Sequence, residues 1–483
     1  MGSISTNDSD NIHDRVSTTS SRFPDLNYLK IILLTGFIHV FILCISNISI
    51  NTLLELEGLP HDRHEKKYYI VSNFNYFQYM VPVAVILVSY LTDKYGAKKT
   101  VSLSIYAISI LIVLLSISPN LFFIRITLIG LGLSSGLKAI PYGLIAILYE
   151  SKHQSFAYTL LFINQILSGI IYYIIIFFKS YKNQIPNWFI LKLVFLQYPQ
   201  LFNALCSAII ILIFGYYSRS LLLPLYDKSD TTSLSIRSDE TQTLISDIDN
   251  TNYNSINSSQ DALYFRFIPK LPTERTVLLI VSYILTQFLI TNAMIILLEW
   301  YMLMFEIDKH DLGLGFESFF PIIIFFVVVA FLLSYLYLPS TLNKFNPSYV
   351  YNITCTAIVI EFAYLIVVIF LQLVLPTFFI TISVTLIAIS LPICFLYSNF
   401  SVMLLLAKVE DRNVGKFTVF GLAFGGYGIL KSVQTSINFK DIFAYFGIIE
   451  NYWIIFVKVF LIILIIIAFL NRYLSQIIFV NNN

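Results

Sequence analysis

The chain has 483 residues, of which 57% are hydrophobic and only 12% are charged, with a formal net charge of +2. Soluble domains carry about 25% charged residues, so this composition argues against a soluble globular protein and favours one whose outer solvent is lipid. The basic residues are scattered through short loops and form no patch or stripe, which gives no reason to expect a nucleic-acid partner.

The four cysteines lie inside apolar stretches, far apart in the sequence: Cys44, Cys206, Cys355 and Cys394. A disulfide framework would place cysteines in exported loops, so we interpret these as small packing residues. The sequence has no Cys-x-x-Cys pair, no His pair on one face of a predicted helix and no ATP-binding Gly-x-x-x-x-Gly-Lys-Ser/Thr loop. We therefore expect no metal, no cofactor and no enzymatic activity.

Apolar stretches long enough to cross a bilayer fill most of the chain. A membrane-spanning helix needs about 20 mostly apolar residues, and backbone groups that face hydrocarbon must pair within their own helix. In chain order, the predicted spans are 28–51, 69–91, 101–118, 121–148, 155–178, 188–217, 277–304, 317–338, 349–374, 377–406, 417–436 and 451–471.

The N-terminal tail, residues 1–27, is polar and is expected to be disordered. Span one then carries His39 about midway along its length, on roughly one helix face with Thr35. Imidazole titrates near neutral pH, so His39 is a candidate for proton coupling. A histidine that is simply hydrogen-bonded to a neighbouring helix is the other interpretation.

Span two carries a cluster of polar side chains that includes Asn75, Gln78 and Tyr79. Amides inside a membrane seek partners on other helices or on a ligand, and a tyrosine ring can stack on an organic solute. The cluster is therefore either a substrate contact or part of the contact between helices.

A short charged segment between spans two and three contains Asp93, Lys94, Gly96, Lys98 and Lys99. Gly96 permits a tight turn with positive φ. Asp93 can accept hydrogen bonds from the end of a facing helix, while the lysines stay on the side of the anionic cytoplasmic leaflet. An ordinary positive-inside loop would explain the lysines but not the Asp-x-x-Gly spacing.

Spans four and five carry polar groups at membrane depth. Arg125 opens span four, Lys138 lies within it, and Asn164 and Gln165 lie in span five. A charge at the middle of a helix costs about 2.5–3.5 kcal/mol on insertion scales. Such residues persist when they face a cavity, pair with a partner or lie near a helix end, so the two cations are candidates for coupling or substrate binding. The two amides are also candidates, and hydrogen bonding between helices is their alternative role.

Residues 222–275 are polar and are expected to form a mostly disordered linker. The linker divides the chain into an N-terminal bundle, 28–221, and a C-terminal bundle, 276–472, of six spans each, followed by a tail, 473–483. Most Lys and Arg residues in the loops lie on the inside if the N-terminus is cytoplasmic. Both termini and the linker are then predicted to be cytoplasmic.

In the second bundle, the polar candidates for coupling or substrate binding are Asn292, Glu299, Glu361 and Lys431. Glu361 lies near the centre of span nine. Desolvation can bring a carboxylate into the range of physiological titration, so Glu361 is a second candidate for proton coupling. The alternative is a structural pair with a lysine of the same bundle, such as Lys431.

The segment from Ser89 to Lys99 resembles motif A of the major facilitator superfamily, Gly-x-x-x-Asp-Arg/Lys-x-Gly-Arg/Lys-Arg/Lys, with Ser89 in place of the first glycine. The resemblance implies an all-α membrane protein with twelve transmembrane helices in two six-helix bundles. It also implies that the residues of motif A latch the two bundles together in one state of the transport cycle.

Other segments resemble the drug:proton-antiporter branch, which includes tetracycline-resistance-like carriers. Arg125 and the glycines that follow it resemble the branch's motif B, and residues 339–346 resemble a second-half copy of motif A. The sequence departs from the branch in span five, where Ser168 and Gly169 stand in place of a Gly-Pro-x-x-Gly-Gly element. A helix without that element should be straighter.

We therefore expect a monomeric secondary transporter that moves a small organic solute across a lipid bilayer by alternating access, with protons as a candidate coupling ion. The plasma membrane and a vacuole- or lysosome-like membrane are the candidate locations. A non-transporting sensor or scaffold with the same fold is the alternative function.

Overall fold

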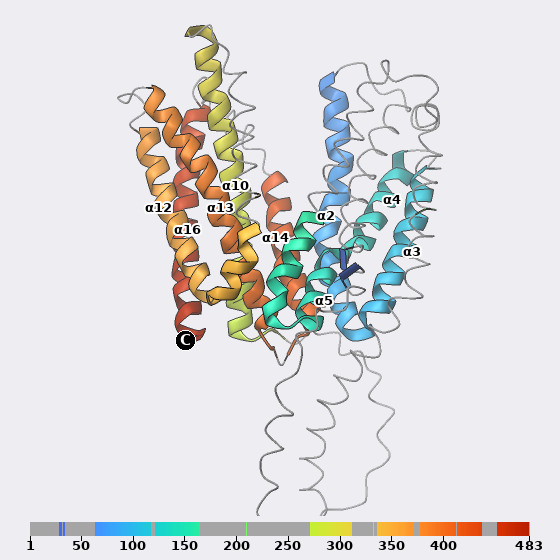
Figure 1. Ribbon diagram of the computed structural model, residues 1–483. Coiled ribbons are helices and arrows are strands. Elements are labelled where there is room, and N and C mark those ends of the chain that lie inside the picture. Colours follow the sequence, from blue (N-terminus) through green and yellow to red (C-terminus); the bar gives the residue numbers. More distant parts are fainter. Residues whose placement is uncertain are drawn as a thin grey trace, which may run out of the picture.

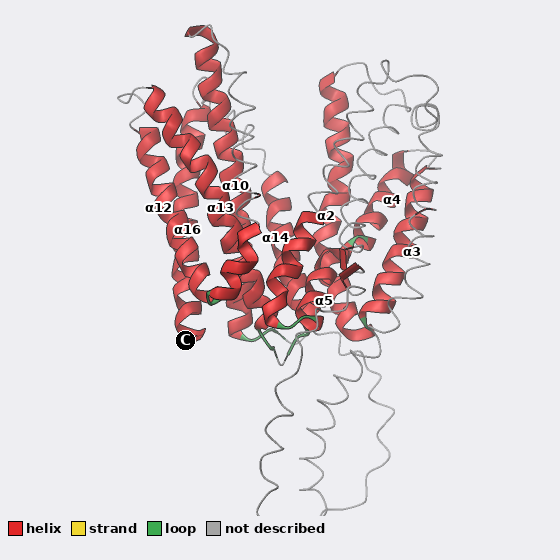
Figure 2. Ribbon diagram, in the orientation of Figure 1, coloured by secondary structure: helices red, strands yellow, loops and turns green. Residues whose placement is uncertain are grey.

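The computed structural model describes residues 29–30, 32–33, 63–116, 121–164, 209, 271–311, 332, 336–370, 377–411, 413–436 and 452–482. Within this part of the chain all regular structure is helical (Figure 2).

The described helices of the first half lie together on one side of the molecule (Figure 1). They are α2 (Arg63–Tyr95), α3 (Ala97–Ser116), α4 (Leu121–Ser134), the 3-10 helix η2 (Gly136–Ala139) and α5 (Ile140–Leu148), followed by helical residues 151–164.

The second half supplies the helices on the other side (Figure 1). They are α10 (Glu274–Asp311), α12 (Pro347–Phe370), α13 (Thr377–Lys408), α14 (Lys416–Ser436) and α16 (Tyr452–Asn482), with a further helical segment at 336–344.

These helices coincide with predicted spans two to four, seven and nine to twelve, and span five is described only in its first part. Spans one, six and eight lie almost wholly outside the described residues, so the count of twelve stays a prediction. Five stretches are long and apolar enough to cross a bilayer: Phe122–Leu148, Glu274–Ala293, Pro347–Val368, Ile389–Lys408 and Phe460–Val480.

Two helix ends differ from the sequence-based boundaries. Helix α10 begins at Glu274, within the predicted linker, and α16 continues to Asn482 through most of the predicted C-terminal tail. The apolar residues Ile477 to Val480 continue the helix, and Ile478 is buried. Residues 473–482 are therefore part of the second half's last helix and do not form a separate tail.

Helix α3 shows how the helices suit a lipid solvent. Ile105 and Ile108 are buried on one face, whereas Leu103, Tyr106 and Ile110 lie on another face and are 50–70% exposed. In water, an apolar surface of this kind marks a contact site or an aggregation hazard. In a bilayer it faces acyl chains, which is consistent with a multi-pass membrane protein.

Helix α14 lies where the two halves meet. It packs chiefly against α2 of the first half and α10 of its own half, and it stands between the two groups of helices in Figure 1. The larger cluster of buried apolar side chains runs through both halves, whereas the smaller one lies wholly in the second half. The core at this junction is therefore shared between the halves.

Span four is broken into α4, η2 and α5. Pro141 is the second residue of α5 and has no N–H to donate to Leu137, so the α-helical bonding pattern is interrupted there. The hydroxyl of Ser135 donates to the carbonyl of Gly132 at 2.8 Å and closes the preceding turn. The break places Lys138 in the short 3-10 segment.

Candidate functional site

The turn between α2 and α3 is formed at Gly96, whose φ is 88°. Its N–H donates to the carbonyl of Thr92 at 2.9 Å. Only glycine adopts this backbone region at low cost, so the positive φ predicted for Gly96 is confirmed. The turn directs the last residues of α2 toward the start of α14.

Asp93, at the end of α2, accepts three hydrogen bonds from the first turn of α14. The N–H of Phe417 lies 3.3 Å from Oδ1, and the N–H and Oγ1 of Thr418 lie 2.7 Å and 2.5 Å from Oδ2. The first N–H groups of a helix have no partner within the helix and carry a partial positive charge. A carboxylate from the first half therefore caps a helix of the second half.

Gly415 precedes α14 and makes this approach possible. A Cβ at this position would overlap Oδ1 of Asp93. Any other residue would displace the carboxylate from the helix terminus. Gly415 and Thr418 were not predicted as site residues, although a glycine and a threonine at the start of a span are signals of a capped helix.

The carboxylate of Asp93 is stabilised chiefly by its α14 donors. Burial of the carboxylate end raises its pKa, and the hydrogen bonds from Thr418 and Phe417 act in the opposite direction without reversing the shift. Lys94 and Lys99 are exposed, and the Lys94 ammonium lies 5.3 Å from the centre of the Tyr95 ring. The side chain of Lys98 lies outside the described part of the structure.

Glycines of α14 allow its close approach to α2. A Cβ at Gly425 would lie 2.8 Å from the carbonyl oxygen of Pro82, and one at Gly421 would lie 2.5 Å from Cβ of Ser89. A Cβ at Gly428 would meet the Pro82 ring at 2.8 Å. Small residues at such a spacing let two membrane helices meet at the backbone, so the two halves are in close contact along α2 and α14.

A second contact between the halves lies at the same end of the molecule. The hydroxyl of Ser155 donates to Oδ1 of Asn343 at 2.8 Å. The ring of Phe417 fits against Gly143 of α5, where a Cβ would overlap the ring. Together with the Asp93 contact, these interactions join the halves at the end that carries Gly96 (the Gly96 end), shown at the bottom of Figure 1.

Lys138 extends from the break in span four toward the second half. Its ammonium lies 5.3 Å from the centre of the Phe424 ring on α14, a distance at which a cation is attracted to an aromatic face. The side chain lies deep among the helices yet keeps part of its surface accessible. The charged group that acts on it is Lys431, a second cation.

The antiparallel packing of α2 and α14 relates Lys431 to the predicted cluster of span two. Ser89 of α2 lies opposite Gly421, and Pro82 lies opposite Gly428. The same register continued outward sets residues 78–79 of α2 level with Lys431. The structure thus brings Lys431 to the same depth as the predicted residues Gln78 and Tyr79.

Asn292 joins the same region from α10. Its side chain exchanges hydrogen bonds with Gln434 of α14, and the neighbouring Thr291 is hydrogen-bonded to Tyr427. Both partners lie within four residues of Lys431. Three predicted candidates, Asn292, Lys138 and Lys431, therefore converge on α14.

Glu361 lies elsewhere, on α12, which packs chiefly against α13 and α16. Its Oε1 accepts a hydrogen bond from Sγ of Cys394 at 3.5 Å. In the described part of the chain the one ion pair within 4 Å joins Glu150 to Lys152. Among the described residues Glu361 is therefore hydrogen-bonded to Cys394 and not paired with Lys431, the lysine named in the alternative interpretation.

The other predicted residues are dispersed or not described. Asn164 donates to the carbonyl of Leu33 at 2.7 Å and so links span five to span one. Arg125 lies near the start of α4 and has an interaction partner. His39 and Gln165 lie outside the described residues, as do the side chains of Asn75, Gln78 and Glu299.

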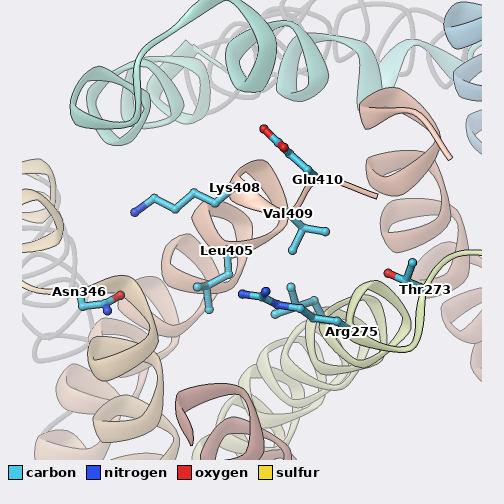
Figure 3. Close-up of a pocket in the computed structure, with 8 residues that line it drawn as sticks. Thr273, Arg275, Asn346, Leu405, Lys408, Val409 and Glu410 are labelled. Atoms are coloured by element: carbon cyan, nitrogen blue, oxygen red, sulfur yellow. The ribbon is translucent and has the colours of Figure 1, made fainter. Parts of the chain in front are cut away.

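A cavity of about 450 Å³ opens at the Gly96 end of the second half (Figure 3). The residues that line it are Thr273, Arg275, Leu279, Asn346, Leu405, Lys408, Val409 and Glu410. They come from the start of α10, the end of α13 and the start of α12, so the cavity lies within one half.

Asp411 anchors the end of the linker next to this cavity. Its Oδ2 accepts hydrogen bonds from the N–H and the Oγ1 of Thr273 at 2.8 Å and 2.9 Å. Burial would raise the pKa of Asp411, but hydrogen bonds from Thr276, Asn413 and Thr273 outweigh it and lower the pKa to about 2. Asp411 was not among the residues predicted from the sequence.

Comparison with known proteins identifies the fold. No family model matches the sequence, and no curated protein matches it. Among solved structures, the human organic anion transporter MFSD10 (TETRAN) is 11% identical with a TM-score of 0.53, over 94% of this chain and 100% of that chain.

Two sugar symporters are similar to the same extent. A structure of the E. coli fucose:proton symporter FucP is 13% identical with a TM-score of 0.50, over 93% of this chain and 99% of that chain. The major facilitator superfamily proton:xylose symporter XylE is 12% identical with a TM-score of 0.55, over 93% and 94%. The expected drug:proton-antiporter branch stays a prediction. At these identities the similarity establishes the fold, and the chain is a multi-pass membrane protein with the major facilitator fold.

Proposed function

We propose that this protein is a secondary transporter that moves a small organic solute by alternating access. One observation carries the proposal: the Asp93 carboxylate on one half caps α14 on the other. A contact of this kind holds the halves together at one end and can be released without unfolding either half. It therefore has the form expected of a latch between two states.

The energy of the latch suits a reversible contact. A hydrogen bond to a charged group contributes roughly 1.5–3 kcal/mol, and 1.4 kcal/mol is a factor of ten in an equilibrium constant. Removing the carboxylate should therefore shift the balance between latched and released states about tenfold to a hundredfold toward release. A transporter needs both states and should lose flux when one is lost.

The test compares solute movement with conformation. Cells that express the wild-type chain, Asp93→Ala or no chain are compared by profiling metabolites in the cells and in the medium. In purified protein lacking the four native cysteines, spin labels at Lys152 and Glu410, one on each half, report the separation at the Gly96 end.

We expect the wild type to alter specific solutes, and Asp93→Ala to abolish most of that change while lengthening the label distance. Glu274→Ala, which removes an exposed carboxylate at the same end, is the matched control and should change neither. If no solute responds to the wild type while Asp93→Ala still alters a cellular signalling response, the protein is a sensor and not a transporter.

Proton coupling is a separate part of the proposal. His39 and Glu361 are the candidate groups, and Glu361 lies away from the junction of the halves. Flux of a responding solute into sealed vesicles should follow an imposed pH gradient and fall when the gradient is collapsed. Flux that ignores the gradient would remove protons from the mechanism and leave the transport proposal intact.

A further inference from the structure

The junction between the two halves contains an accessible cation at membrane depth. Lys138 lies about ten residues from the end of its span, Phe122–Leu148, which is roughly 15 Å along a helix. Its ammonium is held over the Phe424 ring of the other half, while part of the side chain stays accessible.

A second cation lies on the face of α14 that carries Phe424. Lys431 lies seven residues after Phe424 on α14, and positions seven apart share one helix face. The charge of Lys431 acts on Lys138 unfavourably, because both are positive. Two like charges in a region of low dielectric constant repel each other strongly unless an opposite charge or water lies between them.

Across the described part of the chain, no carboxylate lies within 4 Å of either lysine. Glu361, a carboxylate within a span of the second half, is hydrogen-bonded instead to Cys394, between α12 and α13. Lys138 and Lys431 therefore supply two positive charges to the junction, and no described carboxylate lies close enough to either of them to form an ion pair.

The surroundings of the two lysines suit an organic molecule. The Phe424 ring makes contacts with Tyr142 at 4.7 Å and Tyr283 at 5.2 Å between ring centres. The three rings are buried and lie at the depth of Lys138. The region around Lys138 therefore combines a cation with aromatic side chains, which suits a solute with an acidic group and an apolar body.

From this arrangement we infer that the transported solute is an organic anion whose acidic group binds between Lys138 and Lys431. This inference rests on the proposed transport function and adds the chemical class of the substrate. Because Lys138 belongs to the first half and Lys431 to the second, an anion between them contacts both halves at once. The substrate would then be bound at the surface that must open and close during transport.

The experiment extends the metabolite profiling to four lysine variants. Solutes that respond to the wild type are sorted by their formal charge at pH 7. Lys138→Gln and Lys431→Gln test the two cations, Lys138→Arg keeps the charge, and Lys152→Gln removes an exposed lysine outside the junction. Surface expression and thermal unfolding of each variant are measured to establish that it is folded.

We expect the responding solutes to be anions, and the two Gln variants to reduce the response about tenfold to a hundredfold, the effect of losing one charged hydrogen-bond partner. Lys138→Arg should keep most of the response and Lys152→Gln all of it.

Three results would overturn the inference, and they are distinguishable. Neutral or cationic solutes would contradict the substrate class and leave the transport proposal standing. Anion flux that is as insensitive to Lys138→Gln and Lys431→Gln as to Lys152→Gln would contradict the site. No responding solute at all would contradict the transport proposal and this inference together.

Discussion

Asn343 of the second half accepts a hydrogen bond from Ser155 of the first half at 2.8 Å. In residues 339–346, the second-half segment that resembles motif A, Asn343 stands at the position that Asp93 occupies in the first. The two halves are thus joined by a charged contact at one position and a neutral contact at its counterpart. The charged contact should be the stronger of the two.

Changing Asn343 to Asp should make the two contacts more alike. Aspartate keeps an acceptor for the Ser155 hydroxyl and adds a negative charge near the start of the helix at 151–164, worth about 0.3–1 kcal/mol. We expect the latched state to gain about two- to fivefold in population. The label distance between Lys152 and Glu410 would show it, and a longer distance would contradict the assignment.

Changing Gly425 to Ala should weaken the contact between α2 and α14. The new Cβ would meet the backbone oxygen of Pro82 at 2.8 Å, and backbone moves less readily than a side chain. Overpacking of this kind costs about 1–3 kcal/mol.

The adjacent glycine provides the control. A Cβ at Gly426 would meet only the tip of Ile284, at 2.7 Å, which can rotate away. Thermal unfolding should show a clear loss for Gly425→Ala and little change for Gly426→Ala. Equal losses would contradict the proposal, because they would show that the contact with the Pro82 backbone does not decide the effect.

Changing Tyr351 to Phe should destabilise the second half. The Tyr351 hydroxyl donates to Oδ1 of Asn471 at 2.9 Å and lies 3.3 Å from Oγ1 of Thr286, and all three residues are buried. Without the hydroxyl, the Asn471 oxygen loses this donor, at a cost of about 1–3 kcal/mol.

The same substitution at a second, exposed tyrosine is the control for the general effect of removing a tyrosine hydroxyl. Tyr364 donates to Ser383 at 3.0 Å but is 45% exposed and lies four residues from the end of the apolar stretch Pro347–Val368, where a tyrosine hydroxyl can reach the membrane–water interface. Tyr364→Phe should lower the unfolding temperature much less than Tyr351→Phe. A larger loss for Tyr364→Phe than for Tyr351→Phe would show that the buried hydrogen bonds of Tyr351 contribute little to stability.

The Asp411 contact should give a pH-dependent contribution to stability. Its pKa is lowered from 3.8 to about 2 in the folded protein, so the contribution is present above about pH 4 and disappears as the pH falls through 2. Because Asp411 is partly exposed, solvent screening limits the contribution to at most about 1 kcal/mol.

Asp411→Asn tests this directly. The difference in unfolding temperature between wild type and variant should be constant from pH 7 to pH 5 and should shrink below pH 4. A difference that is unchanged at the lowest pH would show that the carboxylate charge contributes nothing.

The turn at Gly96 and the helix-facing carboxylate of Asp93 could be predicted because their chemistry is local. The partner of Asp93 could not, since Thr418 is 325 residues away and the contact depends on how two halves pack. The Cys394 partner of Glu361 could not be predicted either, because spans that are apolar on every face give no periodic signal of their rotation. The end of α16 was misplaced because hydropathy marks where a chain enters lipid and not where a helix stops.

The break at Ser135–Ala139 divides span four into two helices, α4 and α5, that can change their relative angle. Helix α4 packs against α2 and α3, whereas α5 packs against α14 and α13 of the other half. Bending at the break would let α5 move together with α14 and α13 while α4 keeps its contacts with α2 and α3. The Gly96 end could then open without a tilt of an entire half. Pro141→Ala should allow a continuous helix across the break, stiffen span four and slow the exchange between the two distances of the labels at Lys152 and Glu410.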